Sequence, residues 1–159
     1  MESITQLANP LIPYTFPPQV MGWLAIASGA TEIAALLFAL LSVAFGRAFG
    51  RIHDALSGIG AVLVAGVAML LFPEHRLLAQ QLASAAFVLA LIGAFVAALG
   101  GMMGAAELIS TFLAQLHIAS GYALIGVWLL IIVISGAGPL GLPNRTQSMG
   151  LWAGAVMAL

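Results

Sequence analysis

Long apolar runs, each close to the length that crosses a lipid bilayer, fill most of this chain and constrain its fold. A hydrocarbon core about 30 Å thick needs about 20 helical residues at roughly 1.5 Å per residue. Charged residues make up only 6% of the 159 residues, whereas a soluble domain carries about a quarter. We therefore expect an all-α, polytopic transmembrane helical bundle with four complete spans and a partial fifth. The complete spans are predicted at about residues 20–45, 55–72, 82–103 and 112–134.

The partial span, residues 149–159, is apolar but stops with the chain. It covers about half of a bilayer, and each backbone carbonyl left free at mid-bilayer costs several kcal/mol. We therefore expect a fragment of a longer protein. The alternative is a terminal helix that ends at the interface or packs against a partner.

Composition excludes several functional classes. The chain has no cysteine, which excludes disulfides, thiolate metal sites and thiol catalysis. Its net charge is −1 and its few arginines form no basic patch, which argues against nucleic-acid binding. No spacing resembles a metal site or a catalytic constellation, so we expect a non-enzymatic protein without a metal and without an identifiable cofactor.

The segments outside the spans carry turn and capping signals. Residues 1–19 hold four of the seven prolines and predict an extended, proline-rich tail at the membrane interface. Residues 46–53 are predicted to form a polar loop, and residues 73–76 a second turn. The expected caps and ends of helices are Asp54, Pro73, Ser110 or Thr111, and Gly136.

Arginine placement gives a weak prediction of orientation. Arg47 and Arg51 place the first loop in the cytoplasm and the N-terminus outside, although Arg76 and Arg145 then lie outside too. We expect a multi-pass protein of a bacterial inner membrane with this orientation.

Small residues recur at helical spacing along the expected spans. Such residues let helix backbones approach closely in lipid, although Ala and Gly are abundant throughout this chain. We interpret them as seams between helices of this chain, a second copy or a larger complex. The predicted packing residues are Gly29, Gly58, Ala61, Ala65, Ala90, Ala97 and Gly121.

A short internal repeat relates the first span to the fourth. The sequence Ile-Ala-Ser-Gly occurs at residues 26–29 and again at residues 118–121. A duplication with this offset has a three-helix unit, and an odd unit inverts in the membrane, as in many secondary transporters. Chance matches in an apolar composition are the alternative.

Glu32 is the most informative single residue, because it lies near the middle of the first span. An ionisable group at that depth is costly and marks a functional site by default. Ser28 and Gly29 lie one turn away, which turns the carboxyl toward protein. We interpret Glu32, with Ser28, as a proton, cation or ligand site. The alternative is a protonated structural group that hydrogen-bonds another helix.

His117 is a second candidate ligand, since it lies inside the fourth span with Gly121 one turn away. This arrangement suits axial ligation of a tetrapyrrole. A bis-histidine haem, however, needs a second intramembrane histidine, and His53 and His75 are predicted in loops. An interfacial or hydrogen-bonded histidine is the alternative, and Glu107 is interpreted as an interfacial or first-turn carboxylate.

Three stretches resemble small, uncharacterised bacterial membrane proteins classed as domains of unknown function. These stretches are FGRAFGRIHDAL at residues 45–56, YALIGVWLL at 122–130 and GLWAG at 150–154. Proteins of that kind have about six or seven predicted helices. The resemblance implies this architecture and brings no activity, cofactor or functional residue.

Three functions remain open from the sequence. The first is a non-enzymatic accessory or structural subunit that packs against other membrane proteins through its small-residue faces. The second is a small secondary transporter or proton-coupled carrier that uses Glu32. The third, a tetrapyrrole-binding subunit with His117 as ligand, has the least support.

Overall fold

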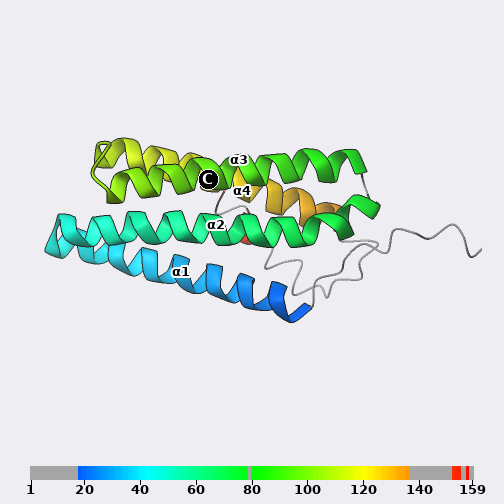
Figure 1. The fold of residues 1–159 in the computed structure, drawn as a ribbon, viewed down its shortest axis with the longest axis horizontal. Helices are drawn as coiled ribbons and strands as arrows, with labels where there is room; N and C mark the ends of the chain where they lie inside the picture. The colour runs from blue at the N-terminus through cyan, green and yellow to red at the C-terminus, as the bar shows by residue number, and fades with distance from the viewer. Residues whose placement is uncertain (1–17, 79, 137–151, 155–156, 158–159) are drawn as a thin grey trace, which may run out of the picture.

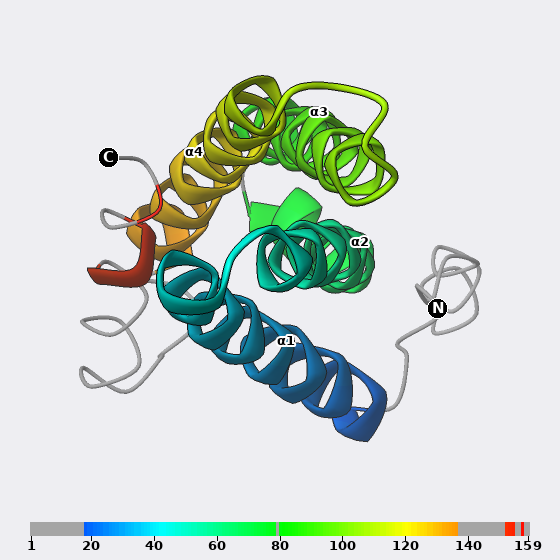
Figure 2. The ribbon, with the colours of Figure 1, turned by 90° about the vertical axis from the view of Figure 1, so that its left-hand side faces the viewer.

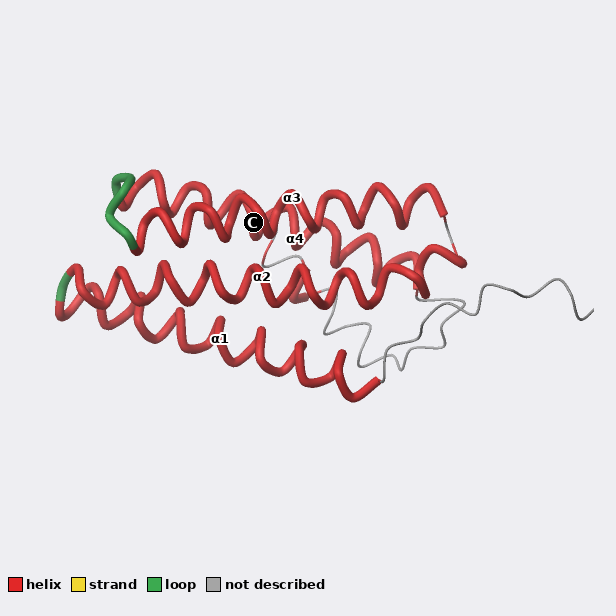
Figure 3. Tube along the Cα trace, viewed as in Figure 1, coloured by secondary structure: helices red, strands yellow, loops and turns green. Residues whose placement is uncertain are grey.

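Four long helices make up almost all of the described chain. The computed structural model describes residues 18–78, 80–136, 152–154 and 157. The helices are α1 (Pro18–Phe45), α2 (Arg47–Leu78), α3 (Gln80–Ala105) and α4 (Thr111–Gly136), and the described residues contain no strand (Figures 1 and 3). The expected all-α bundle is confirmed.

Each of the four helices is long and apolar enough to cross a bilayer. Their apolar stretches run over 24 to 27 residues, or about 36–40 Å of helix, which exceeds the hydrocarbon thickness of about 30 Å. Large apolar side chains point outward on all four helices, among them Val43, Met69, Phe95 and Ile134. Such a surface requires lipid or protein around it, so the chain is a multi-pass integral membrane protein.

The helix α2 occupies the centre of the bundle. It packs against α1, α3 and α4, whereas α1, among these four helices, packs against α2 alone (Figures 1 and 2). The core lies between α2, α3 and α4, where Ala86, Ala90 and Ala94 surround the buried side chains of Ile125 and Trp128. Short alanines on α3 leave the room that these large side chains of α4 fill.

Small residues lie at the closest crossings between helices. A Cβ atom on Gly121 would lie 2.5 Å from the Gly93 carbonyl oxygen and 2.7 Å from the Ala97 Cβ atom, so α3 and α4 touch at their backbones. Gly58 lies similarly against the α3 backbone, 3.3 Å from the Ala98 carbonyl oxygen by the same measure. This approach is the close packing that small residues permit in lipid.

The other predicted packing residues divide into two groups. Ala61, Ala90 and Ala97 are fully buried, and Ala65 is partly buried against the core. Gly29 differs, because no atom lies within 4 Å of the position its Cβ would take. It therefore takes no part in a helix contact among the described residues.

The first turn is shorter than the sequence predicts. Gly46 alone separates α1 from α2, in a left-handed conformation with φ of 91° that glycine adopts without strain. The predicted loop 46–53 is therefore wrong, and Asp54 lies inside α2 rather than at its N-cap. Residues 47–54 are compatible with helical geometry, because none of them is a proline. A continuous helix also satisfies the backbone hydrogen bonds of this segment internally.

The end of α2 also differs from its prediction. Pro73 lies inside α2, which continues to Leu78, so residues 73–76 do not form the predicted turn. Proline removes one hydrogen-bond donor from the helix and can bend it without ending it.

The predicted start of α4 is confirmed, because the Ser110 hydroxyl accepts a hydrogen bond from the Leu113 amide at 3.3 Å, which is N-cap geometry. The described part of α4 runs to Gly136, and residues 138 and 139 of the predicted stop lie outside the described residues. The predicted tail lies almost entirely outside the described residues. So does most of the partial fifth span, of which residues 152–154 and 157 are described and helical.

The α3–α4 crossing leads to a stability prediction. Gly121→Ala places a methyl group against the α3 backbone, and we expect it to lower the free energy of unfolding by about 1–3 kcal/mol. Gly29→Ala meets no neighbour and should leave stability unchanged or raise it by up to about 1 kcal/mol through helix propensity. Reversible unfolding in mixed micelles measures both, and equal behaviour of the two variants would contradict this crossing.

Candidate functional site

A carboxyl group, a phenol and a backbone carbonyl meet in the interior of the bundle. The Tyr122 hydroxyl on α4 hydrogen-bonds the Glu32 carboxyl on α1, and it lies 2.9 Å from the Ser57 carbonyl oxygen on α2. All three residues lie about 15–20 Å along their helices from the Gly46 end of the bundle. The polar contact is therefore deep within the expected hydrocarbon region.

The number of protons available in this contact restricts the protonation state of Glu32. The Tyr122 hydroxyl has one proton but lies within hydrogen-bonding distance of two acceptor oxygens. Both contacts are satisfied at once only when Glu32 is protonated: its carboxyl O–H donates to Tyr122, and Tyr122 donates to the Ser57 carbonyl. The arrangement thus favours a neutral Glu32, which is also the inexpensive form in a membrane.

Gly60 makes room for the Glu32 carboxyl against α2. A Cβ at residue 60 would overlap the Glu32 Oε1 atom and lie 3.0 Å from the Tyr122 hydroxyl oxygen. A side chain at residue 60 would therefore force the Glu32 carboxyl to shift from its present contact with α4. Ser28 is buried one turn before Glu32 on α1, at the side of this contact that is farther from Gly46.

A second polar layer lies nearer to the Gly46 end. The Gln115 amide on α4 donates a hydrogen bond of 2.6 Å to Asp54 Oδ1 on α2, and Asp54 is 3% exposed. The neighbouring His53 has its Nδ1 atom 2.9 Å from the Ala35 carbonyl oxygen on α1. A carbonyl only accepts, so Nδ1 carries the proton, and the Nε2 atom lies 4.0 Å from Asp54 Oδ1.

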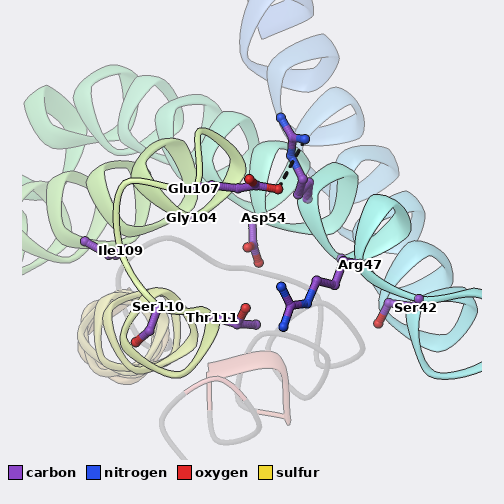
Figure 4. A pocket seen from close by; sticks show the side chains of 11 residues that line it. Ser42, Arg47, Asp54, Gly104, Glu107, Ile109, Ser110 and Thr111 are labelled. Carbon is purple, nitrogen blue, oxygen red and sulfur yellow. Dashed lines mark ion pairs between the residues drawn. The ribbon is translucent and has the colours of Figure 1, made fainter.

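A third polar layer forms a pocket at this end of the bundle. Arg51 makes an ion pair of 3.3 Å with Glu107 and donates a hydrogen bond of 2.9 Å to the Ala105 carbonyl oxygen. Glu107 lies in the loop between α3 and α4 with a left-handed φ of 58°, and not in the first turn of α4. The pocket has a volume of about 670 Å³ and is open to the outside (Figure 4). Its lining comprises Ser42, Gly46, Arg47, Gly50, Arg51, Asp54, Gly104, Glu107, Ile109, Ser110 and Thr111.

The two candidate sites predicted from sequence differ in their surroundings. Glu32 hydrogen-bonds Tyr122 on α4 and lies against Gly60 on α2, whereas the His117 Nδ1 atom lies 2.7 Å from the Leu113 carbonyl oxygen of its own helix. His53 lies in α2 rather than in a loop, and its ring is directed to α1. The structure thus brings polar groups together around Glu32, whereas His53 and His117 each contact a different backbone carbonyl.

Sequence reasoning missed Tyr122, the pocket role of Asp54 and the contribution of Gln115. Tyr122 and Gln115 are polar residues inside an apolar run, and that position was the available signal, whereas Asp54 follows a polar stretch and was interpreted as a cap. Partners between spans were not predictable from it, because Glu32 and Tyr122 are 90 residues apart.

No protein-family model matches the chain, and neither does a curated protein or a solved structure. The resemblance to uncharacterised bacterial membrane proteins stays a prediction.

The tyrosine contact can be tested through stability. Tyr122→Phe leaves the Glu32 carboxyl and the Ser57 carbonyl without this partner, and we expect a loss of about 1–3 kcal/mol. Ser120→Ala removes a hydroxyl from the same helix that bonds only carbonyls of that helix and should change stability by less than about 0.5 kcal/mol. Unfolding in mixed micelles measures the difference, and equal losses would refute the interhelical bond.

Proposed function

We propose that this chain is a small proton-coupled membrane carrier in which Glu32 binds the transported proton. The observation that carries this proposal is the contact of the Tyr122 hydroxyl with both the Glu32 carboxyl and the Ser57 carbonyl deep in the bundle, a geometry that favours a neutral carboxyl. No described cation lies within ion-pair distance of Glu32. Loss of its proton would therefore leave an unpaired charge in the membrane, which is costly, so proton release must accompany a rearrangement or a compensating solute.

The polar layers support a route for the proton from one membrane face. The pocket opens to the outside, Asp54 lines its inner part, and His53 Nε2 lies 4.0 Å from Asp54. His53 also contacts Ala35, one turn from Glu32 on α1. An imidazole with one free nitrogen can accept a proton there and pass it on. The proposed order of proton carriers is Asp54, His53 and Glu32.

The predicted internal repeat is consistent with a carrier. Its offset relates α1 to α4, and these are the two helices that Glu32 and Tyr122 connect. In transporters built from inverted repeats, the binding site lies near the bilayer midplane between the repeats. The Glu32 contact is at a corresponding depth.

An accessory membrane subunit is the second candidate function. Only 11% of the most apolar stretch of α1 is buried, compared with 33% for α3 and for α4. An apolar helix with so little contact to its own chain is suited to packing against another membrane protein. Isolation from native membranes in mild detergent tests this function, and a chain that elutes without any other protein would contradict it.

Proton coupling is tested with the purified chain in liposomes that contain a pH-sensitive dye. Gradients of small polar solutes should drive proton movement through the wild type, and Glu32→Gln should abolish it, because the glutamine amide still donates a hydrogen bond to Tyr122 but exchanges no proton. Glu2→Gln removes a carboxyl group that precedes α1 and is the matched control.

Infrared spectroscopy tests the protonation of Glu32 independently of any solute. The band of a protonated carboxylic acid should be present at neutral pH in the wild type and in Glu2→Gln, and it should be lost in Glu32→Gln. An unchanged band in Glu32→Gln, or proton movement that survives this substitution, would contradict the proposed role.

A further inference from the structure

The pocket at the Gly46 end of the bundle is built from charged groups that do not all satisfy one another. Its volume of about 670 Å³ lies within the usual range for small-molecule sites, about 300–1,000 Å³. It is separate from the Glu32 contact, which lies deeper, but Asp54 belongs to its wall and connects the two regions.

Pairing within the pocket leaves one cation and one carboxylate oxygen for a ligand. Arg51 is already paired with Glu107. Arg47 has no ion-pair partner among the described residues, and its guanidinium group points into the pocket toward Thr111 and Asp54 (Figure 4). Asp54 Oδ1 accepts the Gln115 hydrogen bond, while Oδ2 lies beside the pocket wall at Gly104 and receives no hydrogen bond from the described residues.

The helix ends at the pocket add positive electrostatic potential on the side where Arg47 lies. Arg47 is the first residue of α2 and Thr111 is the first residue of α4, so two helix N-termini lie at the same side of the pocket. Helix N-termini carry partial positive charge and favour anionic groups. Asp54 lies two turns further along α2 and supplies negative charge at the inner side.

We propose that this pocket binds a small zwitterionic solute of the α-amino acid type. The solute's carboxylate pairs with Arg47 and the Thr111 hydroxyl, and its ammonium group pairs with Asp54 Oδ2. A simple anion would leave Asp54 Oδ2 without a partner, and a simple cation would leave Arg47 without one. The claim that this solute is transported rests on the proposed carrier function. Its binding to the pocket can be measured without transport.

The experiment uses the purified full chain in lipid nanodiscs, with L-alanine, propionate and ethylamine as probes. L-alanine should raise the thermal unfolding midpoint and bind in titration calorimetry. Propionate and ethylamine should bind at least roughly tenfold more weakly, because each leaves one charged group unpaired. Equal binding of propionate and L-alanine, or no binding of L-alanine, would overturn the proposal.

Two substitutions assign the charges. Arg47→Gln and Asp54→Asn should each weaken L-alanine binding by roughly tenfold to a hundredfold. Asparagine at position 54 still offers an oxygen to Gln115. Arg51→Gln removes the same charge as Arg47→Gln, but from a side chain that is already paired, and should cause a smaller loss. Equal losses from the two arginine substitutions would overturn the assignment of the carboxylate to Arg47.

A phosphatidylethanolamine headgroup carries the same pair of charges, so lipid is compared directly. L-alanine should bind equally well in nanodiscs with and without phosphatidylethanolamine if the ligand is a free solute. Binding seen only without this lipid would make the headgroup the occupant and overturn the solute proposal.

The outcomes for the two proposals are separable. Binding of L-alanine without proton movement would refute the carrier and keep the pocket assignment. Proton movement driven by another solute class, without L-alanine binding, would refute the pocket assignment and keep the carrier.

Discussion

Polar groups inside a bilayer must find their partners within the protein, because lipid supplies none. Glu32 meets this requirement through Tyr122, which approaches from α4 beside the central helix α2. Of the three other described helices, α1 packs against α2 alone, so this hydrogen bond joins two helices that otherwise do not pack together. The Glu32–Tyr122 contact thus defines where α1 lies relative to α4 and aligns the polar layers around α2.

The rest of the bundle depends on close approach rather than on polar contacts. Gly93 and Gly121 bring the α3 and α4 backbones together, and the alanines of α3 accept the large side chains of α4. A tightly packed unit of α2, α3 and α4 results, with α1 attached at its side (Figure 2). This division places the ionisable group on the least buried helix and its partners on the packed unit.

Hydropathy predicted the four spans because the requirement for about 20 apolar residues is local. It did not predict the helix ends, since α2 continues through Asp54 and Pro73, where the sequence carries signals for a cap and a stop. Glu32 was identifiable from its depth alone. Tyr122 and Gln115 were not, because their importance comes from partners in other helices. The sequence around Asp54 predicted a helix cap. The residue instead lies inside α2, where it accepts a hydrogen bond from Gln115.

The one-residue connection at Gly46 has a mechanical consequence. It joins the ends of α1 and α2 tightly, and α1 diverges from α2 toward Pro18 (Figure 1). Any rotation of α1 as a rigid body about Gly46 would move Glu32, which lies about halfway along the helix, roughly half as far as the Pro18 end. The one-residue connection thus couples the position of the Pro18 end of α1 to the separation between the Glu32 carboxyl group and Tyr122.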